Sequence, residues 1–162
     1  MNDRFYTSQA GHVVNVLAPV DITGGKTGVP FGLKKHSHAS IILQIGVSAA
    51  APGKVQVNAC DDNTGANSVA IDFDVFKAET GDGNAGADVL STRTPCVAAN
   101  GFVPSAGDGI FYVIELDAAQ LPQGKPFVQL SLTNAANSVI ASAVAVLSGS
   151  RYGSEASDTV LS

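Results

Sequence analysis

Apolar and polar residues alternate along most of the chain, which is the spacing of β-strands rather than of helices. In VAIDFDV (residues 69–75) every second residue is large and apolar, and the residues between them are alanine or aspartate. KVQVNAC (54–60) and FVQLSLT (127–133) repeat this period of two. Residues 40–47 and 110–116 are rich in the β-branched and aromatic side chains that favour strands. We therefore predict a strand at each stretch, and the alternating stretches predict one face in a core and the other toward water.

Glycine, proline, asparagine and aspartate separate these strands at short intervals, as in APGK (51–54) and GDGNAG (81–86). Weaker strand patterns lie at residues 12–18 and 87–93. The stretch LDAAQLP (116–122) predicts one helical turn, capped by Asp117 and ended by the proline. About eight short strands punctuated in this way predict an all-β fold, a single jelly-roll-like β-sandwich without a domain boundary.

The two ends of the chain and one long connection lack this alternation. Residues 1–11 and 153–162 are polar and contain glycine and serine, so we predict a flexible N-terminal arm and a flexible C-terminal tail. The sandwich domain is then expected at residues 12–152. The glycine-rich stretch 20–38 is long for a simple turn, and we expect it to be a functional or contact loop.

The last predicted strand, VIASAVAVL at residues 139–147, is unusual because both of its faces are apolar or small. We expect Ile140, Val144 and Val146 to face the core. The opposite face would then be covered by another subunit. A central strand buried within its own subunit fits the pattern equally well. The small face consists of Val139, Ala141, Ala143, Ala145 and Leu147.

Charge is sparse and unevenly distributed. Charged residues make up 14% of the chain, with nine lysines and arginines, and such a surface loses little side-chain entropy when another subunit covers it. Residues 1–60 contain five basic and two acidic residues, whereas residues 61–117 contain ten acidic residues. We interpret Lys34 and Lys35 as a candidate patch facing a partner. Arg151 and Tyr152 follow the last strand and are candidate contacts at the rim of that interface.

Several classes of function are disfavoured by the sequence. The sequence lacks a basic stripe with interleaved aromatic residues, so it does not predict nucleic-acid binding. The longest apolar run is far shorter than the ~20 residues that a membrane-spanning helix needs. The opening MNDRFYTSQAGH lacks the apolar core of a signal peptide, so we expect synthesis in the cytoplasm. Cys60 and Cys96 are accordingly expected to be buried free thiols, with a disulfide or a reactive thiol as the alternatives.

Candidate chemistry is limited to two patterns. His36 and His38 form a His-x-His pair, but no acid lies at residues 39–43 and no histidine follows, so three protein ligands for a catalytic metal are lacking. The loops CDDNTG (60–65) and ETGDGNAGAD (79–88) carry acids and asparagines. These residues could bind calcium, but they are also the residues that commonly form turns. The acidic and amide residues of these loops are Asp61, Asp62, Asn63, Glu79, Asp82, Asn84 and Asp88. We predict no enzyme activity, no metal and no cofactor.

The C-terminal part of the chain resembles the small head decoration, or cement, proteins of tailed bacteriophages. The stretches that carry the resemblance are IELDAAQL (114–121), which leads into a strand, and LSGSRY (147–152), in which small residues precede an Arg-Tyr pair. The resemblance covers roughly the last 50 residues as a pattern of medium specificity.

The resemblance implies a β-sandwich or jelly-roll subunit, usually a homotrimer, on the exterior of a phage capsid. There it would bridge neighbouring major capsid proteins after the shell expands, without catalytic residues. Alternatives from other classes remain open. They are a fibre or tail module that binds a receptor or glycan through its loops, an enzyme or metal-binding barrel that uses His36 and His38, and a shell or tube subunit that assembles alone.

Overall fold

The computed structural model describes residues 7, 11–48, 50–77, 90–106, 109–133 and 137–150. These residues form strands and one short 3₁₀ helix, η1 (Ala118–Gln120), which confirms the predicted all-β fold. None of their helices is long and apolar enough to span a membrane. The strands are β1 (Gly11–Asp21), β2 (Lys26–Thr27), β3 (Phe31–Gly32), β4 (His36–Ile45), β5 (Val55–Cys60), β6 (Val69–Ala70), β7 (Phe73–Lys77), β8 (Thr94–Cys96), β9 (Ile110–Asp117), β10 (Phe127–Leu132) and β11 (Ile140–Ser150).

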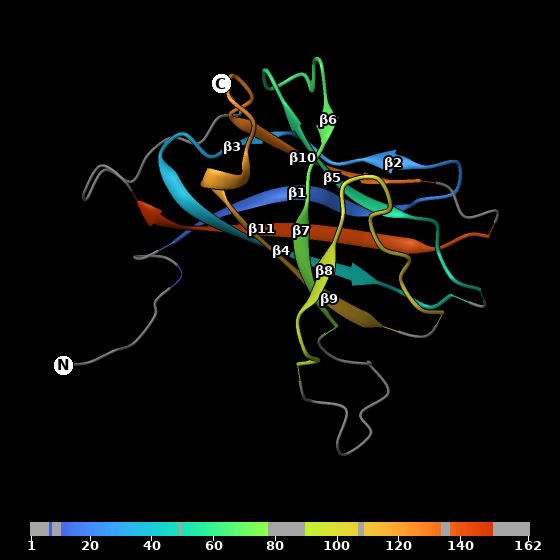
Figure 1. Ribbon diagram of the computed structural model, residues 1–162. Coiled ribbons are helices and arrows are strands. Elements are labelled where there is room, and N and C mark those ends of the chain that lie inside the picture. Colours follow the sequence, from blue (N-terminus) through green and yellow to red (C-terminus); the bar gives the residue numbers. More distant parts are fainter. Residues whose placement is uncertain are drawn as a thin grey trace.

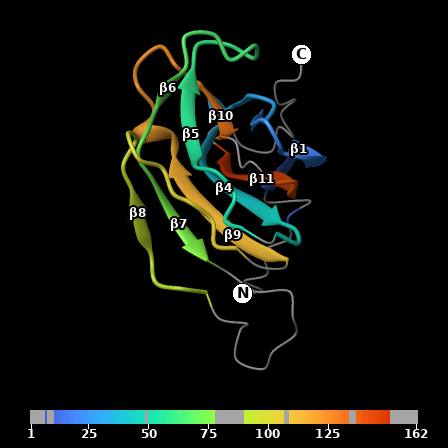
Figure 2. The same ribbon diagram turned by 90° about the vertical axis from the view of Figure 1, so that its right-hand side faces the viewer.

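The strands, labelled in Figure 1, form two antiparallel sheets with the order of a jelly roll. One sheet has the order β1-β11-β4-β9-β7-β8, and the other has the order β2-β10-β5-β6, with β3 also pairing with β10. Figure 2 shows β7 and β8 at the edge of the larger sheet opposite β1. Apart from β3, β7 and β8, eight strands remain. Numbered along the chain, they give sheets of order 1-8-3-6 and 2-7-4-5, which is the double Greek key of a jelly roll.

The core lies between the two sheets and follows the predicted alternation. Every second residue of β5, β9 and β10 is buried, and the residues between them are partly or fully exposed, except Cys60 at the end of β5, which is buried as well. Phe102, in the connection before β9, packs edge-on against Phe73 at 6.2 Å and lies 5.1 Å from the ring of Tyr112. Both cysteines are buried and free, as predicted.

The predicted strand at 69–75 is divided between the two sheets. Val69 and Ala70 pair with β5, whereas β7 begins at Phe73 and pairs with β8 and β9. Asp72 lies at the crossing, where its Oδ1 accepts a hydrogen bond from the Ala98 N–H at 2.7 Å. Val69 is 47% exposed, contrary to the alternation, whereas Ile71 is buried on the way into the second sheet.

The connection at residues 20–38 is more regular than its glycine content suggested. It contains the end of β1, the short strands β2 and β3, and the start of β4. Its Gly28 N–H donates to the Leu130 carbonyl in one sheet at 2.8 Å, and the Val29 N–H donates to the Val16 carbonyl in the other at 2.7 Å. This segment therefore ties the two sheets together along one side.

The remaining predictions have mixed outcomes. The helical turn is confirmed as η1, where the Asp117 N–H donates to Oε1 of Gln120 at 2.6 Å. Residues 90–93 are not a strand, and residues 87–89 lie outside the described residues. The tail at 153–162 and nearly all of the arm at 1–11 also lie outside them, although Gly11 already belongs to β1.

Candidate functional site

The alanine face of β11 lies in the core, so the interpretation of this face as a subunit contact is wrong. Ala141 and Ala143 are 1% exposed and Ala145 is 0% exposed. The alternative of a central strand buried within its own subunit holds for this face only: β11 lies between β1 and β4, and its alanines face the core. The physical reason is complementary size. The three alanines lie opposite Ile45, Leu43 and Ile41 of β4, so small side chains on β11 fill the space that large neighbours leave.

The opposite face of β11 is outward and apolar. Ile140 is 50% exposed and Val144 is 36% exposed, so the larger residues that were expected in the core lie outside it. Strand register extends this surface over five strands. We call it the outer face, and its apolar residues, all at least partly exposed, are Val13, Ile42, Phe76, Phe111, Val113, Ile140, Val144 and Val146.

The outer face has the layout of a protein-binding surface. One row of directly paired residues runs across the sheet through Val144, Ile42, Val113 and Phe76, and begins at the exposed Asn15 on β1. An apolar centre bordered by polar residues is typical of protein interfaces. Contiguous apolar surface of this kind is uncommon on monomeric proteins unless it binds something. Polar neighbours on the same face are Ser40, Gln44 and Ser142.

A compact acid-histidine cluster lies at one end of the outer face. His38 Nδ1 is 2.8 Å from Oδ1 of Asp117, and His38 Nε2 is 2.7 Å from Oε2 of Glu115. The Ser40 hydroxyl donates to the same Glu115 oxygen at 2.6 Å. The register of β4 against β9 makes the cluster, because it places His38 opposite Asp117 and Ser40 opposite Glu115.

The cluster favours a protonated histidine. Partial burial lowers the pKa of His38, but the hydrogen bonds and negative charges of Asp117 and Glu115 outweigh it and raise the pKa above its ordinary value. The order Ser40, His38, Asp117 resembles the sequence of groups in a catalytic triad. Here, however, Glu115 occupies Nε2, and Ser40 is 3.4 Å from that nitrogen. The imidazole is therefore not available as a base for Ser40.

His36 lies two residues away in a contrasting environment. It is 6% exposed, its Nδ1 has no hydrogen-bond partner, and its ring centroid lies 6.3 Å from that of His12. Burial, followed by the charges of His12 and Lys35, lowers the pKa of His36. The two histidines of the His-x-His pair therefore do not act together. Among the described residues no group of three or more histidines, cysteines, aspartates or glutamates is arranged to hold a metal ion.

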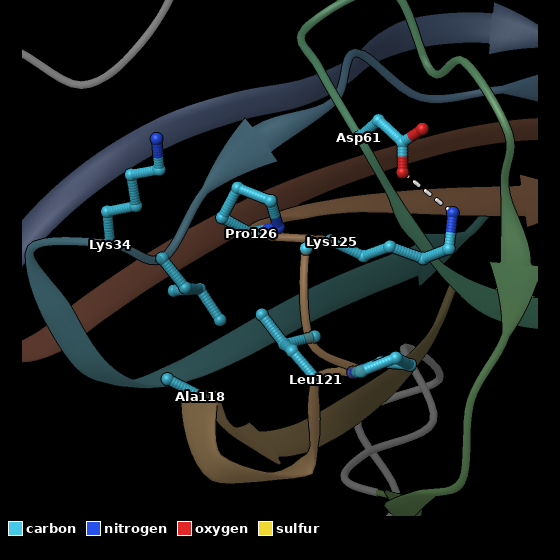
Figure 3. A pocket seen from close by; sticks show the side chains of 9 residues that line it. Lys34, Asp61, Ala118, Leu121, Lys125 and Pro126 are labelled. Carbon is cyan, nitrogen blue, oxygen red and sulfur yellow. Dashed lines mark hydrogen bonds and ion pairs between the residues drawn. The ribbon is translucent and has the colours of Figure 1, made fainter.

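Lys34 stands beside an open groove of about 450 Å³ at one end of the sandwich. Figure 3 shows an apolar floor that includes Ala118, Leu121 and Pro126, with Lys34 on one side and Lys125 extending toward Asp61 on the other. The two walls are joined because the Leu33 N–H donates to the Pro126 carbonyl at 2.9 Å. Lys35 is exposed next to Lys34.

The acidic loop after β5 stabilises local structure. Oδ1 of Asp62 accepts hydrogen bonds from the Thr64 N–H at 2.9 Å and the Thr64 hydroxyl at 2.6 Å. Asp61 accepts hydrogen bonds from Lys125 at 2.7 Å and Asn67 at 2.6 Å. Asp62 is thus used within the loop, as turn residues commonly are, and Asp61 also links the loop to Lys125 in the turn before β10. The second acidic stretch considered for calcium, including Glu79 and Asp82, lies outside the described residues.

Sequence reasoning identified only part of these surfaces. Lys34 was found from charge asymmetry, but the floor of its groove comes from residues 118–126, far away in the chain. The outer face and the His38 cluster were missed. The available signal was a period of two along one strand, which places the apolar residues 111 and 113 and the acids 115 and 117 on the same face. Arg151 and Tyr152 lie outside the described residues.

The fold and these surfaces define a jelly-roll β-sandwich with an exposed apolar sheet face. No protein-family model matches the chain, and no curated protein matches it significantly. Among solved structures, the chain is similar to the SPBc2 prophage-derived protein YomS. The two share 13% sequence identity over 84% of this chain and 92% of that chain, with a TM-score of 0.43. This structural neighbour is a phage-derived protein, and a likeness at this level carries no inference about what the chain binds.

Proposed function

We propose that this protein is a structural virion protein that binds the exterior of a phage capsid and bridges neighbouring major capsid proteins. The observation that carries the proposal is the outer face, where apolar residues from five strands lie together. The resemblance of residues 114–121 and 147–152 to capsid decoration proteins supplies the identity of the partner. In this proposal the protein acts by binding alone, without a catalytic step or a cofactor.

The mechanism follows from mass action. A protein that binds the assembled shell and not its separate subunits stabilises the shell by its binding free energy. A homotrimer, as the resemblance implies, would present three outer faces at once, and each contact raises the effective concentration for the next. Many modest apolar contacts then hold the shell together.

The proposal is tested by sedimenting the protein with purified expanded shells that lack it. We expect the wild type to pellet with shells and the double variant Ile140→Ser/Val144→Ser to bind at least about ten-fold more weakly, because both side chains lose apolar contact area. The matched control is Val69→Ser/Val97→Ser, since these exposed valines lie outside the outer face. Wild-type retention of the Ile140/Val144 variant would overturn the role of the outer face.

Two further readouts separate the proposal from its alternatives. The solution mass should be that of a small closed oligomer, whereas growth into open-ended assemblies would indicate a shell or tube subunit. Sedimentation with host cells in place of shells would favour a receptor-binding module of a fibre or tail.

A further inference from the structure

We propose that the groove beside Lys34 binds a short protein segment in which a carboxylate lies next to an apolar side chain. The floor supplies the apolar half of this specificity. Ala118, Leu121 and Pro126 line the groove and are partly exposed, and Leu121 also packs against the hydrophobic core. A leucine-sized side chain laid on this floor would remove apolar surface from water on both partners.

The charge of the groove supplies the other half. Lys125 is already neutralised, because its Nζ donates to Asp61 Oδ1 at 2.7 Å and to the Asn67 carbonyl at 2.5 Å. Lys34 makes no hydrogen bond or ion pair in the part of the chain that the structure describes, and it is exposed. The groove therefore has one uncompensated positive charge on one side of an apolar floor, which complements a single carboxylate.

The shape favours a peptide segment over an enclosed small molecule. The groove is open, and its volume of about 450 Å³ suits a few side chains. Its walls are held in advance by the bond from Leu33 to Pro126 and by the turn in which the Lys125 N–H donates to the Pro122 carbonyl at 3.1 Å. Two prolines further restrict this wall, so little ordering is needed on binding.

This inference extends the proposed function, under which the segment would belong to a capsid subunit. Its experiment needs no shell, so its failure leaves the outer-face proposal standing, and the reverse also holds. A displayed library of random peptides is selected on the wild-type protein, on Lys34→Glu and on Lys26→Glu. Lys26 is the matched control because it is an exposed lysine on β2, outside the groove.

We expect peptides with Asp or Glu beside Leu, Ile, Val or Phe to be enriched on the wild type and on Lys26→Glu, but not on Lys34→Glu. A selected peptide should bind Lys34→Glu at least about ten-fold more weakly, and a copy with lysine in place of its acid should regain affinity for that variant. Amide shifts in NMR spectra should map to residues 33, 118 and 121. Enrichment without acids, wild-type binding by Lys34→Glu, or shifts elsewhere would each overturn the proposal.

Discussion

At the scale of single residues, two histidines two positions apart respond to protons in opposite ways. His38 lies between the carboxylates of Glu115 and Asp117. It is paired with Ser148 of β11, and Ser40 of its own strand lies beside its ring. Asp74 of β7 lies opposite Glu115 in the sheet, and its carboxylate forms a salt bridge with Arg93. His36 is buried beside His12 and Lys35 with an unpaired Nδ1. One site is built for an imidazolium and the other for a neutral ring.

Replacement of His38 by glutamine should destabilise the protein mainly in acid. The pKa of His38 is raised in the folded state, so its contribution is complete below the unfolded pKa and is lost as the pH rises through the folded pKa. We expect a loss of about 1 kcal/mol, reduced by partial solvent exposure. Urea unfolding at pH 5.5 and pH 8.5 measures the difference. An equal loss at both values would contradict the ion-pair role.

Replacement of His36 by leucine should remove a weakness toward acid. The pKa of His36 is lowered in the folded state. As the pH falls through the unfolded pKa, the unfolded chain therefore binds more protons than the folded protein, and the free energy of unfolding decreases. The leucine variant lacks this titration and also lacks the unpaired Nδ1. Between pH 6.5 and 5 its free energy of unfolding should decline less than that of the wild type. Parallel declines of the two proteins would show that His36 is not the group responsible.

At the scale of elements, β11 has two apolar faces whose roles depend on its neighbours. Its inward alanines are opposed by large residues of β4, and its outward valines lie on the outer face. This arrangement gives the two faces opposite tolerance to substitution.

Ala143→Leu should destabilise the protein by about 1–3 kcal/mol, because the core has no room for the added atoms beside Leu43. Val144→Ser, one residue along the strand, should change stability by less than about 1 kcal/mol, since its side chain is already 36% exposed. Thermal or urea unfolding of the pair checks the assignment. A larger loss for Val144→Ser would mean that the faces are reversed.

The elements also explain how far the sequence predicts the structure. Period-two patterning identified β5 and β10 with their buried residues, because one face of each is clearly more polar, whereas β9 was predicted from its β-branched and aromatic residues alone. It could not locate the crossing at Asp72, since the same alternation continues from one sheet into the other. It could not orient β11, because the choice depends on residues of β4. The His38 cluster depends on strand register, which places His38 beside Glu115 and Asp117 although they lie 77 and 79 positions further along the chain.

At the scale of the whole molecule, the two proposed binding surfaces should differ in their response to salt. The outer face is apolar at its centre, so retention on shells through this face should change little between 0.1 and 0.5 M NaCl. Peptide binding at the Lys34 groove depends on one exposed charge and should weaken over that range. The screening length of charges is about 10 Å at 0.1 M and becomes shorter as salt is added. Titrations at both salt concentrations measure each effect. Strong salt sensitivity of shell retention would assign that contact to charges instead.

The two buried thiols have a consequence for how the molecule opens. Cys60 ends β5 in the smaller sheet, and Cys96 ends β8 at the edge of the larger one. Burial raises the pKa of both thiols, so each reacts with an alkylating reagent only when its surroundings open. The protein therefore carries one chemical reporter in each layer. The relative labelling rates of the two cysteines would reveal which sheet yields first under heat, acid or mechanical load.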